Sequence, residues 1–314
     1  DTKLQKPKGT YRIIFTGGDS AWGLTSGRNT VDFFLEELIQ KDFPNTRIEV
    51  LNASASSYRS HQHLIKHITF LQFLEPDMVI IMGGHEDYYR FYKHYPVEEL
   101  YGNEQYEYRQ WPMTDHSLLA AALLVARSLG EYSNVFKLLY TIGATKRGVW
   151  WGESEIKSPV KRVSSKYNLD TKSGFDQFRK DYTQSFKHII VETYRNLHAL
   201  LARHNIDFVI ASQPELVLLD KEFMTSNEKS YNDWYVAEKG GKSFVKEWEA
   251  FYKVFPGILQ EATDEMSNTT YLNLQELTKT FLGKSEGLLA DYCHPGVEGS
   301  KYIAETFYSH KIGR

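Results

Sequence analysis

The chain has 314 residues, of which 41% are hydrophobic and 25% are charged, so it can bury a full core without disulfide or metal cross-links. Its 37 Lys and Arg residues face 40 Asp and Glu residues, and the net charge of -3 argues against nucleic acid as a partner. A single cysteine, Cys293, excludes an intrachain disulfide and any zinc site that needs several thiolates.

No apolar run approaches the roughly 18–20 residues that cross a bilayer, so we predict no membrane span within the chain. The longest apolar runs are Leu118–Arg127 and Met78–Met82. The sequence starts at Asp1 with a polar run and no methionine. We therefore expect an extracytoplasmic protein, periplasmic or secreted, or one anchored through a membrane segment that lies outside this sequence. The sequence does not indicate an oligomeric state.

Short β-branched runs alternate with longer helical patterns along the chain, which predicts an α/β fold with a mainly parallel sheet. The strands read as buried on both faces. In chain order we predict strand Tyr11–Thr16, helix Val31–Asp42, strand Arg47–Asn52, helix Ser60–Leu74, strand Asp77–Met82, one extended or kinked helix Asp176–His204, strand Asp207–Ser212, helix Phe244–Met266, strand Thr270–Leu274 and helix Gly296–His310.

Residues 88–174 fit this alternation poorly, because they hold one clear helix, Ser117–Tyr140, among aromatic and charged loops. We interpret them as an insertion between the third and fourth strands of a single domain, either a lid or substrate wall or a helical ornament without a binding role. Trp111, Trp150 and Trp151 within it either stack on sugar rings or anchor loops.

Chemically capable side chains follow the predicted strands at their carboxyl ends, where open parallel sheets bind ligands. The first strand runs into GGDSAWG, whose glycines permit a tight turn that presents Ser20 as a candidate nucleophile. The second strand runs into a loop of small residues around Ser57, whose backbone N–H groups can approach a developing oxyanion. Asp291 and His294 stand three residues apart, a spacing that lets one turn carry a base and its orienting carboxylate.

These segments resemble, in order, the conserved blocks of the SGNH (GDSL-type) hydrolases. Gly18-Asp19-Ser20 resembles block one, and GGDSAWG is similar to the GGS-x-A-x-G form of one exported bacterial branch, as is SQPE at 212–215. NASASSYRS resembles N-A-G-x-x-G-x-x-S and puts the oxyanion glycine at Ser57, while D-x-x-H-P matches Asp291 and His294. The resemblance implies a flavodoxin-like, doubly wound five-stranded sheet. It also implies a Ser20–His294–Asp291 triad, with the N–H groups of Ser20 and Ser57 as oxyanion donors.

Block three departs from the G-x-N-D of this family, because Gly84 and His85 are followed by Glu86 where the family has Asn. An ionised carboxylate cannot donate a hydrogen bond, and loss of one oxyanion donor typically costs about 10²–10³ in rate. Three interpretations are open. Burial keeps Glu86 protonated; Glu86 turns away and His85 donates instead; or the protein is slow or inactive on ordinary esters.

The predicted function is ester hydrolysis through an acyl-serine intermediate, without a metal or organic cofactor. The resemblance implies an O-acylated carbohydrate, a lipid or a small ester as substrate. Two alternatives remain: an O-acyltransferase that uses the same serine, and a non-catalytic module that binds a glycan or another partner, which the presence of Glu86 would suit.

Two further patterns have a structural interpretation that we favour. His61, His63 and His67 include a pair at metal-binding spacing on a helix, but ordinary helix histidines are the simpler interpretation. Cys293 adjoins the proposed base and is expected to pack as a small apolar side chain.

Overall fold

The computed structural model describes residues 5–23, 29–92, 166–283 and 286–312. The chain divides into two compact units, one formed by Asp1–Lys93 with Arg162–Arg314 and the other by His94–Lys161. The second unit lies outside the described residues, as do the predicted helix 117–140 and the three tryptophans of the insertion. At the borders of the predicted insertion, residues 88–92 belong to helix α4 (His85–Tyr92) and residues 172–174 to helix α10 (Lys172–Phe186).

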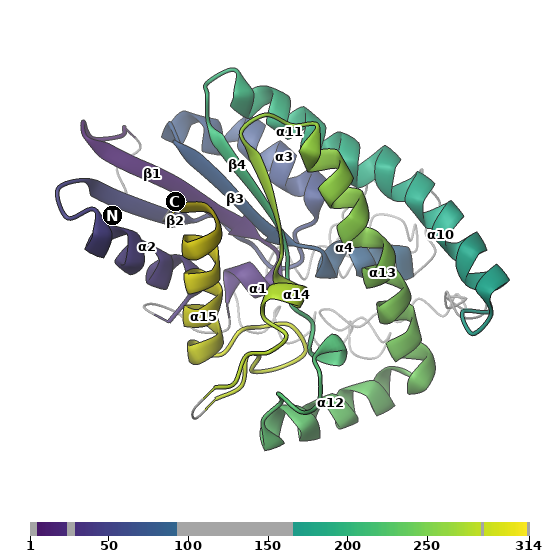
Figure 1. The fold of residues 1–314 in the computed structure, drawn as a ribbon. Coiled ribbons are helices and arrows are strands. Elements are labelled where there is room, and N and C mark those ends of the chain that lie inside the picture. Colours follow the sequence, from purple (N-terminus) through teal and green to yellow (C-terminus); the bar gives the residue numbers. More distant parts are fainter. Residues whose placement is uncertain (1–4, 24–28, 93–165, 284–285, 313–314) are drawn as a thin grey trace, which may run out of the picture. The chain divides into compact units, whose positions relative to one another are not determined.

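Five parallel strands form one sheet in the order β2-β1-β3-β4-β5 (Figure 1). This is the flavodoxin-like, doubly wound order that the sequence predicts. Ile14 in β1 lies opposite Leu51 of β2 and Val79 of β3. The strands are β1 Thr10–Gly17, β2 Arg47–Asn52, β3 Met78–Gly83, β4 Asp207–Ser212 and β5 Thr269–Asn273.

Helices cover both faces of the sheet (Figure 1). Helices α2 (Val31–Asp42) and α15 (Val297–Phe307) contact each other on one face, and α3 (Ser60–Thr69) and α11 (Glu192–Ala202) contact each other on the opposite face. Helix α13 (Lys242–Asp264) contacts β5 and α10. The chain therefore winds outward from β1 in both directions, which leaves the carboxyl ends of β1 and β3 at the point where the strand order reverses.

The core follows from the period-two alternation of strand side chains. Ile13 and Phe15 belong to a cluster with Leu35 of α2 and Phe307 of α15, and the Phe15 and Phe307 rings meet edge to face at 6.0 Å. Ile14 points to the other face and is also fully buried. Both faces of β1 are thus covered, as the continuous apolar run YRIIFT requires.

The predicted extended or kinked helix 176–204 is a continuous helical run with a π-helical turn, η3 (Lys187–Val191), between α10 and α11. Two other helical regions differ from the predictions. The predicted helix 60–74 ends at Thr69 and continues as the 3₁₀ turn η1 (Leu71–Leu74). Helix α12 (Ser226–Lys239) was not predicted, because its apolar residues form no clear stripe; a capping box between Thr225 and Glu228 starts it.

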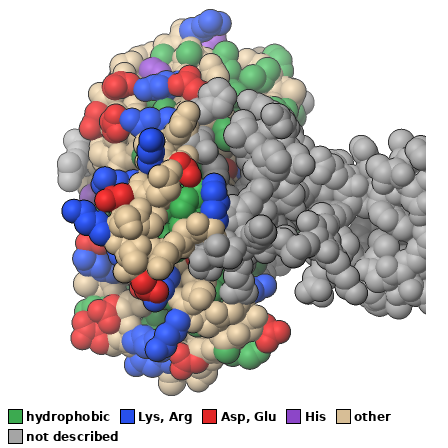
Figure 2. Space-filling view, turned by 90° about the vertical axis from the view of Figure 1, so that its right-hand side faces the viewer, with side chains coloured by type: hydrophobic (Ala, Val, Ile, Leu, Met, Phe, Trp, Pro, Cys, Tyr) green, Lys and Arg blue, Asp and Glu red, His purple; other side chains and the backbone are tan. Residues whose placement is uncertain are grey.

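Acidic and basic side chains are interspersed on the described part of the face shown in Figure 2. Exposed ion pairs such as Lys187–Glu261 at 2.8 Å and Arg195–Glu265 at 2.7 Å join charges of opposite sign. Within the described ranges, no helix combines the length and the apolar character that a bilayer crossing needs.

Candidate active site

Ser20 lies where the strand order reverses, in the short helix α1 (Asp19–Trp22) that follows β1. Gly17 permits this turn, because a Cβ there would stand 2.1 Å from the Met82 carbonyl oxygen and 2.4 Å from the Ala21 Cβ. The close approach of β1 to β3 thus explains the first glycine of the sequence motif. Ser20 itself is only 2% exposed.

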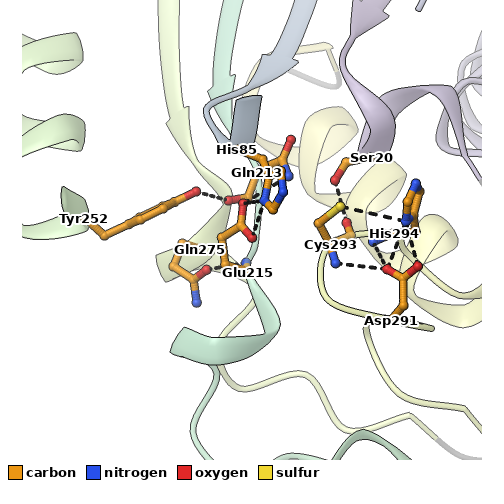
Figure 3. A network of polar contacts seen from close by, with 9 residues as sticks. All are labelled: Ser20, His85, Gln213, Glu215, Tyr252, Gln275, Asp291, Cys293 and His294. Atoms are coloured by element: carbon orange, nitrogen blue, oxygen red, sulfur yellow. Dashed lines mark hydrogen bonds and ion pairs between the residues drawn. The ribbon is translucent and has the colours of Figure 1, made fainter. Parts of the chain in front are cut away.

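Asp291 and His294 form a hydrogen-bonded pair in the loop that leads to α15 (Figure 3). The His294 Nδ1 lies 2.9 Å from Oδ1 and 2.8 Å from Oδ2 of Asp291. Oδ1 also accepts the N–H groups of Cys293 at 3.0 Å and His294 at 2.9 Å. Burial alone would raise the pKa of Asp291, but these hydrogen bonds outweigh it and lower that pKa. The ionised carboxylate therefore holds the imidazole proton at Nδ1, which leaves Nε2 as the basic nitrogen.

The Ser20 hydroxyl is bound to this same loop, 273 residues along the chain, where it donates to the Cys293 carbonyl at 2.5 Å (Figure 3). The structure thus brings the three predicted triad residues together at the carboxyl edge of the sheet. The hydroxyl bonds to the carbonyl beside His294 rather than to the imidazole, so proton transfer to Nε2 requires a rotation of the Ser20 side chain.

Cys293 is fully buried between these groups, with its Sγ 3.8 Å from the His294 Nδ1. Burial raises the pKa of the Cys293 thiol well above its ordinary value. The thiol is therefore neutral and poorly nucleophilic, since the thiolate is the reactive form.

The Ser57 backbone N–H, a predicted oxyanion donor, donates to the Asp19 Oδ1 at 2.8 Å. Ser57 has a φ of 60°, in the left-handed region that favours glycine. The resemblance places a glycine at this position, and the backbone conformation accounts for that preference. In this structure the Ser57 N–H is therefore directed at the residue that precedes the candidate nucleophile.

Glu86 lies in the first turn of α4, and its side chain packs against Gly18, where a Cβ would stand 3.0 Å from the Glu86 Cγ. Burial raises the pKa of Glu86 to about 8, and the charge of Asp19 and a hydrogen bond to Asp19 act in the same direction. A protonated Glu86 is a hydrogen-bond donor at neutral pH. This agrees with the first of the three interpretations of the block-three departure.

The second interpretation makes His85 a donor, and one of its two ring nitrogens, Nδ1, is paired with a carboxylate. That nitrogen lies 2.8 Å and 3.0 Å from the two carboxylate oxygens of Glu215, which follows β4 (Figure 3). Gln213 Nε2 donates to the same carboxylate at 3.0 Å. Glu215 is the last residue of the SQPE string, and nothing in the sequence indicates its pairing with a histidine 130 residues away. Gly84 supplies the turn before His85, with a φ of 122°.

The loop that carries Asp291 and His294, called the catalytic loop below after its proposed role, is anchored by helix α12, which the sequence did not predict. Glu228 of α12 accepts the Leu289 N–H at 3.1 Å, and a Cβ at Gly287 would stand within 2.3 Å of the Glu228 carboxylate atoms. Within the loop, the Ala290 N–H donates to the His294 carbonyl at 2.8 Å. These contacts fix the segment that carries the Asp291–His294 pair.

His63 and His67 of α3 are buried in neutral form, whereas His61 is partly buried. Burial lowers the pKa of His63 to about 3 and that of His67 to about 4, and the His63 Nδ1 lies 3.2 Å from the Thr16 hydroxyl. Among the described residues, the group whose potential metal-ligand atoms lie within 4.8 Å of one another is Asp291, Cys293 and His294. There the His294 Nδ1 already faces the Asp291 carboxylate, and the thiol is neutral, so the donor set suits a triad better than a metal.

Comparison with solved structures finds similar folds at low sequence identity. The acetyl xylan esterase AlAXEase matches with a TM-score of 0.47 at 10% identity, over 96% of this chain and 100% of that protein. Axe2, an acetylxylan esterase from Geobacillus stearothermophilus, was compared as a catalytic mutant and matches with a TM-score of 0.44 at 13% identity, over 95% and 93% of the two chains. An alpha/beta hydrolase from the metagenome of Lake Arreo, Spain, has a TM-score of 0.43 at 10% identity, over 95% and 94%. No protein-family model and no curated protein matches the chain.

Proposed function

We propose that this protein is a serine ester hydrolase that works through an acyl-serine intermediate. The observation that carries the proposal is the hydrogen bond of the Ser20 hydroxyl to the loop that holds the Asp291–His294 pair. A nucleophile, a base and an orienting carboxylate, in contact through one loop, are the parts that acyl transfer requires.

In the proposed reaction, the Ser20 hydroxyl rotates from the Cys293 carbonyl to the Nε2 of His294, which takes its proton as Oγ attacks the ester carbonyl carbon. The tetrahedral intermediate collapses, the bond to the alcohol oxygen breaks, and His294 returns the proton to the leaving alcohol. Water, deprotonated by His294, then attacks the acyl carbon. The bond between this carbon and the Ser20 Oγ breaks, His294 returns the proton to Oγ, and the carboxylic acid is released. Asp291 keeps the imidazole in the required tautomer and stabilises its charged form.

The Ser20 N–H and the protonated Glu86 carboxyl are the proposed donors to the oxyanion. Glu86 takes the place of the family's Asn, and its proximity to Gly18 and Asp19 places it beside the nucleophile. In the free protein both Glu86 and the Ser57 N–H are hydrogen-bonded to Asp19, so each becomes an oxyanion donor once the substrate oxygen replaces the Asp19 carboxylate as its acceptor. Donors aimed at the developing charge are commonly the largest contribution to such catalysis.

The substrates that the resemblance implies are O-acylated carbohydrates, lipids or small esters, and we propose that they are met outside the cytoplasm. An acyltransferase would form the same acyl-serine but pass the acyl group to an acceptor hydroxyl. Product analysis with and without an added sugar alcohol separates transfer from hydrolysis.

Labelling by a serine-directed fluorophosphonate, read by mass spectrometry, tests the proposal. We expect stoichiometric labelling of Ser20 together with turnover of short p-nitrophenyl esters, and we expect Ser20→Ala to abolish both. Ser309→Ala is the matched control, because the Ser309 hydroxyl also donates to a backbone carbonyl, that of Thr306, but in the last helical segment. Wild-type protein that is folded yet neither labelled nor active would contradict an enzymatic role and favour a non-catalytic binding module.

A further inference from the structure

A second, buried histidine–carboxylate pair lies beside the triad and has no part in the proposed proton transfer. His85 is 3% exposed and Glu215 is 1% exposed, and the two side chains meet at 2.8 Å and 3.0 Å. Gln275 Oε1 accepts the Glu215 N–H at 2.6 Å, and Gln213 donates to the Glu215 carboxylate. Gln275 thus fixes the backbone of Glu215, and Gln213 fixes its buried carboxylate, which therefore presents one orientation to His85.

Two aromatic rings pack against the His85 imidazole. The Trp248 ring is stacked on His85 at 5.3 Å and 28°, and the Tyr292 ring lies at 5.2 Å and 33°. Tyr292 also meets the His294 ring at 5.8 Å and 72°, so one side chain touches both histidines. The His85 ring therefore has a set position relative to the catalytic loop.

The charges near this pair influence the protonation of Glu86. Burial alone would lower the pKa of His85, but the charge and hydrogen bond of Glu215 raise it, with smaller effects from Glu86 and Asp19. Glu86 in turn faces His85 and Arg59, which oppose its protonation, and Asp19, which favours it. A positive charge on His85, which belongs to α4 like Glu86, therefore lowers the pKa of Glu86, whereas Asp19 raises it.

We propose that His85 and Glu215 are a positioning pair that holds a positive charge beside Glu86 and thereby sets the pH above which Glu86 stops donating a hydrogen bond. Its catalytic consequence rests on the proposed function, whereas the charge coupling between His85 and Glu86 does not. His85 acts through Glu86 and not on the substrate, and Glu215 acts through His85.

The first test needs no turnover. ¹³C NMR of protein labelled at the Glu carboxyl carbons, with Glu86→Gln to assign the signal, follows Glu86 in the wild type, in His85→Gln and in Glu215→Gln. We expect the Glu86 midpoint to rise by about one pH unit or more in both variants, because an opposite charge at this range typically lowers a carboxyl pKa by about 1–3 units. His67→Gln, which removes a buried neutral histidine from α3, should leave it unchanged. Equal midpoints in wild type and Glu215→Gln would overturn the proposal, even if His85→Gln does not fold.

The second test measures kcat/KM against pH with p-nitrophenyl acetate. We expect the alkaline fall of wild-type activity to move to higher pH in Glu215→Gln, to be absent in Glu86→Gln, and to stay absent in Glu86→Gln/Glu215→Gln. A merely structural role would lower the rate at every pH without moving the midpoint, and that result would also overturn the proposal. Failure of Ser20 to react with fluorophosphonate, with the NMR shift intact, would contradict the proposed function alone.

Discussion

The two ends of the sheet differ in how their buried charged groups are paired. At the amino end, Arg12 of β1 is fully buried and donates to Glu49 at 2.9 Å and 2.8 Å and to the Leu74 carbonyl at 2.7 Å. Asp77 accepts the Arg12 N–H at 2.7 Å and the Lys6 ammonium at 2.6 Å. Each of these charges therefore meets a group of opposite sign or a hydrogen-bonding partner.

At the carboxyl end, two histidine–carboxylate pairs also join groups of opposite sign, but two acidic groups lie near each other as well. The nearby charge of Asp19 helps to raise the pKa of Glu86. Ser57 has a left-handed backbone conformation, and its N–H donates to the Asp19 carboxylate. Such arrangements cost stability and are retained where they serve a site. The difference is what the proposed function requires, with the amino end holding the fold together and the carboxyl end carrying the proposed chemistry.

The largest expected effect is a loss of activity from a substitution at the carboxyl end. Asp291→Asn should lower kcat on a short p-nitrophenyl ester by about 10⁴-fold, because an amide at this place stabilises the wrong imidazole tautomer. Steady-state kinetics measures the loss, and circular dichroism confirms that the variant is folded. A loss below about tenfold would mean that Asp291 does not orient the base.

At the amino end the expected effect is on stability instead. Arg12→Met should lower the free energy of unfolding by about 3–5 kcal/mol, because it leaves the Glu49 carboxylate without its buried partner. Urea denaturation measures this change. The kcat of the folded fraction should equal that of the wild type, and a loss of kcat would show that the two ends are not independent.

Glu86→Gln should raise the stability of the carboxyl end. The raised pKa means that the folded state binds a proton that the unfolded state has lost, so wild-type stability falls as the pH rises from the ordinary value of 4.5 to about 8. The gain from Glu86→Gln should therefore grow across this range, by about 5 kcal/mol at about 1.4 kcal/mol per pH unit, and then level off. Urea denaturation at several pH values measures it, with Glu222→Gln, an exposed carboxylate, as control. A gain independent of pH would contradict protonation of Glu86.

The smallest expected effect concerns the anchor of the catalytic loop. Glu228→Gln should lower stability by about 1–2 kcal/mol, because the charge-assisted hydrogen bonds to Leu289 and Thr225 become neutral ones. A several-fold fall of kcat should accompany it through a looser Asp291–His294 pair. An unchanged kcat at reduced stability would show that Glu228 supports α12 but not the loop.

Local patterns sufficed for much of the fold and part of the site. The five apolar runs predicted the strands within about a residue at most ends, and the turn at Ser20 follows from its glycines. The contact of Asp291 with His294 is also local, because three residues separate them. Helix α12 was not predicted, because its sequence has no apolar stripe. Its cap and its contact with the catalytic loop stabilise it instead.

By itself, the sequence determined the parallel α/β architecture, the residues at the strand ends and the chemical types available there. Tertiary structure alone decided that Glu86 lies near Asp19, that His85 pairs with Glu215 across 130 residues, and that the Ser20 hydroxyl meets the Cys293 carbonyl. The physical reason is that hydrophobic periodicity is a property of neighbouring residues. Protonation and hydrogen bonding depend on burial and on charges that only the order of the strands brings together.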